Sequence, residues 1–331
     1  MVLTVLKNCG KWDVVAGVFS IKAPTFERMV IRFLSVLLPI LYDLYVTPLA
    51  DRYTMLRLQT SNNAFRFYPC ARYATEITFQ QSNMPAGTQA ERSEFYSAKH
   101  KQHGFKVEVS VLPNGLAINC TDHYRGSFSD ITIFRRNMEF HRVQLHKLDA
   151  EQRVPDDGPM QDVHDSEWAV LVDKGYQGLP AVIRAIHPRR KPSGHRLSSA
   201  DEETNRKISS DRIIVENFFG RLCSLWGICS DKYRWMEANY DMIFKACVSL
   251  TNLHIRTQPL RQNDGHAYSA YIRRLRGIGL EKQAKRVEIQ RLSRARRQIR
   301  TEVCLLALPG DRGDDRFDND SDTDIPSEDF A

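Results

Sequence analysis

Hydrophobic residues in the first sixty positions recur with the spacing of an amphipathic helix. The apolar face is formed by residues at i, i+3, i+4, i+7, i+8 and i+11: Phe26, Met29, Val30, Phe33, Leu34 and Leu37. A shorter apolar segment at 12–19 precedes this face, so we expect residues 1–60 to form a helical region. Two helices joined by a short turn are typical of a helix-turn-helix, in which Arg28 and Arg32 would enter the major groove of DNA. An ordinary helical hairpin that packs on the next domain is the alternative.

The most apolar stretch of the chain, residues 33–50, contains Pro39 and Asp43 and has charged residues at both ends. Charged side chains are costly inside a bilayer, so the segment makes a poor membrane span. We interpret it as a core helix and expect no membrane partner.

The spacing of the hydrophobic residues changes in the middle of the chain, from about residue 71 to 256, where strand-like alternation appears. Tyr73, Thr75, Ile77 and Phe79 alternate with Ala74, Glu76 and Thr78, which predicts a strand. Residues 105–111 alternate in the same way, and the turn at 113–115 leads into the apolar run 116–120. These two strands should form a hairpin. A helical stretch at 130–145 follows.

An unbroken apolar run at 168–172 ends in a carboxylate, Asp173. A later helix at 209–226 carries Glu216 at the edge of its buried face. Three antiparallel strands, a helix, a buried strand and then helices is the order of an RNase H-like α/β fold, a mixed sheet of antiparallel and then parallel strands flanked by helices. In that fold the first strand, the end of the fourth strand and a late helix meet at one edge of the sheet. Glu76, Asp173 and Glu216 would lie there.

The charge of the chain indicates which partners it can bind, and its cysteines indicate which structural sites it lacks. The net charge of +7 and the pI of about 9.0 favour an anionic partner, nucleic acid first. The seven cysteines are scattered without a CxxC pair, which argues against both a disulfide framework and a zinc site. Residues 257–300 form a basic extension, interpreted either as a nuclear-import or DNA-backbone segment or as a solvated helix, and residues 301–331 form an acidic tail expected to be disordered. We expect a nuclear protein.

Three carboxylates around one point can hold two Mg²⁺ or Mn²⁺ ions, which prefer oxygen ligands. Such ions activate an attacking water or hydroxyl and stabilise the leaving oxygen of a phosphodiester. Basic residues near the site would hold the backbone of double-stranded DNA without sequence preference: Lys99, Lys101, Lys106, Lys174, Arg189, Arg190 and Lys191. Asp122 and Asp130 are rival ligands, although we expect Asp130 to cap the helix that begins there, because the pair Ser129-Asp130 suits a helix N-terminus.

Several motifs in this order resemble the core of DDE superfamily endonucleases of the Harbinger type, which are transposase-derived proteins. They are YATEITFQQ at 73–81, YSAKHK at 96–101, GFK at 104–106, GSFSD at 126–130, VDKGYQG at 172–178 and DRIIVENFFG at 211–220. The resemblance covers about residues 70–256 and implies an RNase H-like fold with Asp173 and Glu216 as the second and third metal-binding carboxylates. It also implies a divalent metal cofactor, and DNA cleavage and strand transfer at transposon ends, with either a homodimer or a separate DNA-binding protein as partner.

The family's first catalytic residue is an aspartate on the first strand, whereas this chain has Glu76 there. The extra methylene moves the carboxylate by roughly 1.5 Å, and such sites need positioning within about 0.5 Å. Two hypotheses therefore remain: a metal-dependent nuclease or transposase with weakened catalysis, and a DNA-binding protein that keeps the fold without the chemistry. For Glu216 the alternative to a metal ligand is a helical ion pair with Arg212.

Overall fold

The computed structural model describes residues 1–191, 194 and 196–306. The chain divides into two compact units, Met1–Lys282 and Gln283–Ala331. Most of the predicted acidic tail, residues 307–331, lies outside the described residues.

A mixed sheet forms the centre of the first unit. Its strands are β1 (Ala71–Gln81), β2 (Tyr96–Ser97), β3 (Gln102–Val111), β4 (Ala117–Cys120), β5 (Tyr124–Arg125), β6 (Ala169–Leu171) and β7 (Ala185–Ile186). The order is β2-β3-β1-β6-β7, and β4 and β5 also pair with β3. β1 is antiparallel to β3 and parallel to β6, while β6 is parallel to β7. The predicted hairpin is confirmed as the antiparallel pair β3–β4, and the mixed α/β sheet is confirmed with it.

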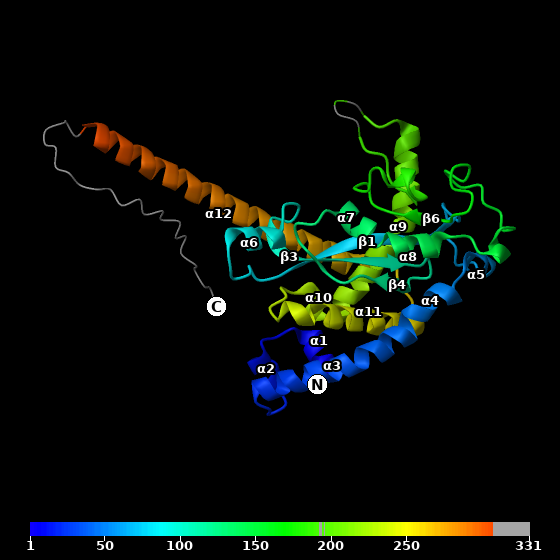
Figure 1. Ribbon diagram of the computed structural model, residues 1–331, viewed down its shortest axis with the longest axis horizontal. Helices are drawn as coiled ribbons and strands as arrows, with labels where there is room; N and C mark the ends of the chain where they lie inside the picture. Colours follow the sequence, from blue (N-terminus) through cyan, green and yellow to red (C-terminus); the bar gives the residue numbers. More distant parts are fainter. Residues whose placement is uncertain (192–193, 195, 307–331) are drawn as a thin grey trace. The chain divides into compact units, whose positions relative to one another are not determined.

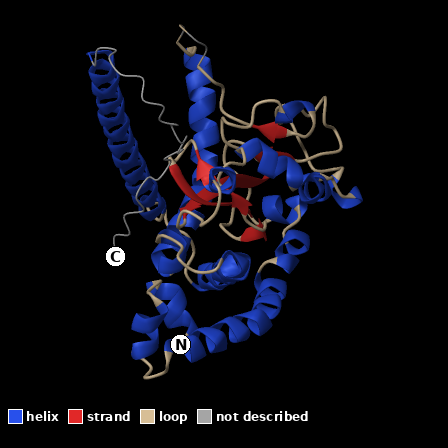
Figure 2. Ribbon diagram, turned by 60° about the vertical axis from the view of Figure 1, so that its left-hand side comes forward, coloured by secondary structure: helices blue, strands red, loops and turns tan. Residues whose placement is uncertain are grey.

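Helices cover both faces of this sheet (Figure 2). They are α6 (Gln89–Phe95), α7 (Asp130–Arg136), α8 (Met138–Leu145), α9 (Ser199–Leu225), α10 (Gly227–Ser230) and α11 (Tyr240–Thr257), with 3₁₀ turns at Asp149–Glu151, Leu179–Ala181 and Glu237–Asn239. The last helix, α12 (Gly265–Leu306), begins in the first unit and continues into the second. Successive side chains of a strand point to opposite faces. Tyr73 on β1 contacts α8 through His141, whereas Gln80 on the other face is hydrogen-bonded to Tyr240 of α11. Glu76 lies on the same face of β1 as Gln80, and its carboxylate accepts a hydrogen bond from Arg212 of α9.

Five helices precede the sheet: α1 (Val2–Asn8), α2 (Trp12–Gly17), α3 (Ala23–Tyr45), α4 (Thr47–Arg52) and α5 (Met55–Thr60). α3 runs along α11 (Figure 1). The Asn252 side chain of α11 joins the two regions, because its amide donates to the carbonyls of Tyr45 and Ala117 and its oxygen accepts from the Ala117 N–H.

The apolar face of α3 is only partly buried. Phe26, Val30 and Leu34 are buried, but Met29 and Phe33 are exposed. The prediction of a core helix over 33–50 is therefore only partly right. By length and composition the segment Ala23–Arg52 could also cross a membrane, and 17% of its most apolar window is buried.

Two helix boundaries differ from expectation. The predicted helix at 130–145 is divided at Asn137 into α7 and α8. α9 begins at Ser199, ten residues before the predicted start at 209, because the Ser198 side chain accepts a hydrogen bond from the Asp201 N–H and caps it. Asp201 and Glu202 also place negative charge in the first turn, where the helix dipole favours it.

Candidate active site

The pairing of β1 with β6 brings two of the predicted carboxylates together. Ala74 of β1 is in register with Leu171 of β6, and the strands are parallel. Two residues further along each strand's direction lie Glu76 and Asp173, on the same side of the sheet. Glu216 comes from α9, the helix that packs on β1.

Arg212 of α9 lies between the two strand carboxylates. Its Nη2 is 3.3 Å from Glu76 Oε2, and its Nη1 is 3.4 Å from Asp173 Oδ1. The Arg212 side chain is only 7% exposed, against 21% for Glu76 and 39% for Asp173. One guanidinium group therefore bridges the carboxylate of Glu76 on β1 and that of Asp173, which follows the end of the neighbouring strand β6.

Glu76 has an unusual environment for a carboxylate. Burial raises its pKa to about 7, with the charges of Glu216 and Asp173 acting in the same direction and Arg212 acting against them. Burial and the two neighbouring carboxylates therefore both favour the protonated form of Glu76.

Glu216 is half-buried and makes no hydrogen bond or ion pair with any residue that the structure describes. The helical ion pair with Arg212 that the spacing allows does not form, because the guanidinium reaches across to the strands. The rival ligands have other partners. Asp122 pairs with Lys245, and Asp130 binds Lys99 and Lys106. Asp130 lies in the first turn of α7 but is not the predicted cap, because the Ser129 side chain accepts the hydrogen bond from the Thr132 N–H.

As arranged here, these residues do not fit a bound metal ion. Among the described residues, no group of three or more His, Cys, Asp and Glu side chains is placed to hold one. The Arg212 guanidinium occupies the position between Glu76 and Asp173 that a shared cation would need.

The predicted DNA contacts differ in how exposed they are. Exposed on the surface are Arg28, Arg32, Lys99, Lys174, Arg189, Arg190 and Lys191, although Lys99 pairs with Asp130 and Arg189 with Asp201. Lys106, by contrast, is 6% exposed and donates to Asp130 and to the Phe128 carbonyl. The sequence places it among phosphate contacts, whereas the structure uses its ammonium group to hold β3 to the start of α7. Lys101 is half-buried at a left-handed backbone position with φ 56°.

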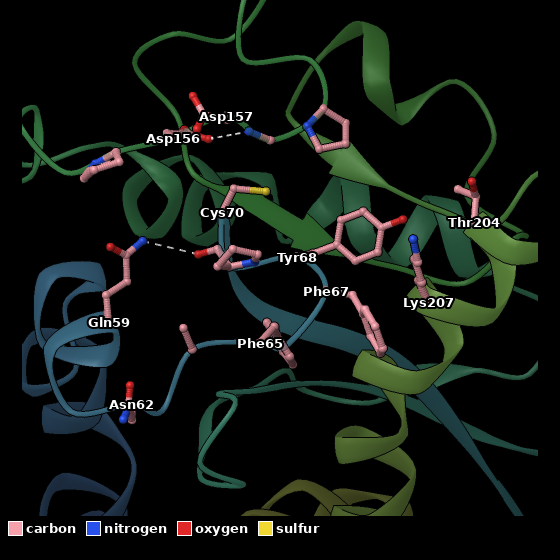
Figure 3. Close-up of a pocket in the computed structure, with 15 residues that line it drawn as sticks. Gln59, Asn62, Phe65, Phe67, Tyr68, Cys70, Asp156, Asp157, Thr204 and Lys207 are labelled. Atoms are coloured by element: carbon pink, nitrogen blue, oxygen red, sulfur yellow. Dashed lines mark hydrogen bonds between the residues drawn. The ribbon is translucent and has the colours of Figure 1, made fainter.

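A pocket of about 770 Å³ lies beside α9 and is lined on that side by Thr204 and Lys207 (Figure 3). Phe67, Tyr68, Thr204 and Lys207 are among its lining residues. Asp211 accepts hydrogen bonds from the N–H groups of Phe67 and Tyr68, so it ties this wall to α9. None of the three carboxylates lines the pocket, and it is separate from the candidate site.

Sequence reasoning missed the role of Arg212. Its position four residues before Glu216 places both side chains on one face of α9. The spacing indicated a cation near the carboxylates, but it indicated Glu216 as the partner of Arg212, whereas the partners are Glu76 and Asp173.

Residues 73–252 match the family model described as DDE superfamily endonuclease, which is more than half of the chain. The chain belongs to this family. The matched segment of this DDE endonuclease contains Glu76, Asp173, Arg212 and Glu216. The superfamily indicated by the sequence motifs is therefore confirmed, while the Harbinger type stays a prediction.

A curated relative is the "Probable transposase for insertion sequence element IS702" of Microchaete diplosiphon. It is 26% identical over 144 residues, which is 43% of this chain and 44% of that protein. The chain thus spans less than half the length of this relative. No solved structure matches the chain.

Proposed function

We propose that the protein is a transposase-derived DNA endonuclease of the Harbinger type with an RNase H-like core. The observation that carries the proposal is the in-register extension of β1 and β6, which sets Glu76 beside Asp173 within the segment that matches the family. The strand order supports the core assignment. Three strands, β4, β3 and β1, are joined antiparallel in that spatial order, and β6 and β7 continue the sheet in parallel.

The proposed reaction is cleavage of a phosphodiester in double-stranded DNA, followed by strand transfer at the ends of an element. Endonucleases of this superfamily generally use divalent metal ions, and we propose Mg²⁺ or Mn²⁺ here. Asp173, Glu216 and Glu76 are the side chains whose chemistry suits such ions. Exposed cations such as Lys174, Arg190 and Lys191 would bind the DNA backbone. Assembly as a homodimer, or with a separate DNA-binding protein, would supply recognition of the ends.

A second candidate is a DNA-binding protein that keeps the fold and has lost the chemistry. Two observations favour it: the longer side chain of Glu76 at the first position, and the Arg212 guanidinium between Glu76 and Asp173.

One experiment separates the two. The full chain is incubated with end-labelled duplex DNA and Mn²⁺, alongside Asp173→Ala and Glu76→Asp. Cleavage by the wild type that Asp173→Ala abolishes supports the endonuclease. Because a misplacement of about 1 Å can cost a hundredfold in rate, we expect Glu76→Asp to be faster by roughly that factor.

Asp122→Asn is the matched control, since Asp122 is 72% exposed and paired with Lys245. It should cleave like the wild type. Cleavage by Glu76→Asp alone would support the second candidate, and no cleavage by any variant would overturn the endonuclease assignment.

We also propose a nuclear location, on the basic residues between 283 and 300. A fluorescent fusion of the full chain should accumulate in the nucleus, and replacing Arg294, Arg296 and Arg297 by Gln should disperse it. A cytoplasmic signal from the unaltered fusion would contradict this location.

A further inference from the structure

Arg212 is the most enclosed charged side chain at the candidate site. Its two terminal nitrogens reach separate carboxylates, at 3.3 Å from Glu76 on β1 and 3.4 Å from Asp173 just after β6. Its third nitrogen, Nε, is buried without a hydrogen-bond partner among the described residues. A buried donor without a partner costs about 1–3 kcal/mol. The side chain therefore gives up one hydrogen bond to hold this bridging position.

The charges explain why a cation is held there. Glu76, Asp173 and Glu216 bring three carboxyl groups to one edge of the sheet, and like charges at short range raise each other's energy. A single guanidinium that contacts two of them relieves part of that repulsion. A planar guanidinium with several donors suits this task, because it can bond two acceptors at once.

We propose that Arg212 is an internal counter-ion that competes with divalent metal for Glu76 and Asp173, so that metal binds only after its guanidinium leaves. This regulation rests on the proposed function in that a divalent cation is taken as the working partner of the site. While the Arg212 guanidinium bridges Glu76 and Asp173, these two carboxylates are closed to a metal ion. The strength of the contact between Arg212 and the two carboxylates sets the metal concentration that is needed to displace the guanidinium.

The competition has a measurable size. When a ligand binds only an open state, its apparent affinity falls by the fraction of molecules that are open. If about one molecule in ten is open, removal of the bridge should tighten metal binding about tenfold.

The test is calorimetric titration of the full chain with Mn²⁺ in the absence of DNA. Arg212→Gln removes the charge and keeps a polar side chain, and we expect it to bind Mn²⁺ about tenfold or more tightly than the wild type. Its metal-free melting temperature should fall, because the carboxylates lose their counter-ion, and saturating Mn²⁺ should restore it. An affinity equal to or weaker than that of the wild type would overturn the proposal.

A conservative substitution and a matched control test whether the change in affinity is specific to the Arg212 bridge. Arg212→Lys keeps the charge and is the better tolerated substitution, but an ammonium group is a point charge that bridges two carboxylates less well. It should bind Mn²⁺ with intermediate affinity. Arg206→Gln removes the same charge from the same helix, at an exposed pair with Glu203, and should leave the affinity unchanged. A gain by Arg206→Gln as large as that of Arg212→Gln would show a general charge effect and overturn the competition.

The outcome is independent of DNA cleavage. If Arg212→Gln binds Mn²⁺ more tightly but no variant cuts DNA, the competition stands and the endonuclease assignment fails. If neither the wild type nor Arg212→Gln binds Mn²⁺, the competition fails whatever the cleavage assay shows.

Discussion

His123, in the loop between β4 and β5, lies between two carboxylates. Its Nδ1 is 2.9 Å from Asp241 Oδ1 and its Nε2 is 3.2 Å from Glu237 Oε1. Burial opposes protonation of the ring, but the hydrogen bonds and charges of Asp241 and Glu237 outweigh it and raise the pKa of His123. The same contacts lower the pKa of Asp241 against the effect of its burial. When it is protonated, the His123 ring holds this loop to the start of α11 through both carboxylates.

The stability from this cluster should depend on pH. Because the folded pKa of His123 is raised above the unfolded value of about 6.5, its contribution is complete below that value and is lost as pH rises through the folded pKa. Asp241 has a lowered pKa, so its contribution is present above about 3.9 and is lost as pH falls through the folded value. We expect His123→Gln to reduce the free energy of unfolding by about 2 kcal/mol at pH 5.

Urea unfolding of wild type and His123→Gln at pH 5, 7 and 9 measures the effect. The difference between them should shrink toward pH 9. A difference that is the same at all three pH values would show that His123 acts through packing alone.

Individual site residues were predictable from the sequence to different degrees. Glu76 and Asp173 could be paired because each follows from a strand pattern, and parallel neighbouring strands bring corresponding positions together. Arg212 could be placed near them, but not its partners, because the direction of a long side chain depends on the surrounding packing. Lys106 gave no sign of its burial, since lysine in an alternating strand reads as solvent-exposed.

The C-terminal half of α9 approaches the backbone of the segment before α12 very closely at Gly220. A Cβ built on Gly220 would lie 1.9 Å from the Asp264 carbonyl oxygen. The neighbouring Arg221 binds the Asp264 side chain, so this contact is fixed from two sides. Only glycine allows the helix and this segment to approach so closely.

We therefore expect Gly220→Ala to lower the free energy of unfolding by about 1–3 kcal/mol or more, since backbone atoms must move to admit the methyl group. Gly277 in α12 is the matched control, because a Cβ there meets nothing within 4 Å. Gly277→Ala should instead stabilise by about 0.5–1 kcal/mol, as alanine does in an exposed helix. Thermal unfolding followed by circular dichroism compares the two, and an unaltered melting temperature for Gly220→Ala would contradict the close approach.

At the scale of elements, buried segments were the most predictable. β1, β3, β4 and β6 follow apolar patterns whose period reflects their burial. The first ten residues of α9 were missed because they are mainly polar and show no apolar stripe, and the helix there depends on its cap. α3 shows the opposite error. Its apolar face predicted a helix correctly, but the pattern does not reveal how much of that face is buried against other elements.

Positive charge on the molecule as a whole should govern its affinity for DNA. The net charge is +7, and each phosphate neutralised contributes a slope of about −0.9 to log K against log salt concentration. Replacing Arg190 and Lys191 by Ala should reduce the slope by about 2, measured by fluorescence anisotropy of a labelled duplex. Lys106→Gln should leave the slope unchanged, because its ammonium group is buried against Asp130. A slope that the double substitution does not alter would remove this segment from the DNA contact.

The parallel pairing of β1 with β6 also sets the order in which the molecule can be completed. β1 meets its antiparallel neighbour β3 after only the intervening residues 82–101, but Ala71 and Tyr73 pair with Ala169 and Val170, which come much later in the chain. Contacts between such distant parts of a chain are slow to form, because a long loop must close first. During synthesis one edge of β1 therefore carries unpaired backbone groups until β6 has left the ribosome, and such an edge is a template for aggregation. The strand that precedes Asp173 thus also covers the open edge of β1.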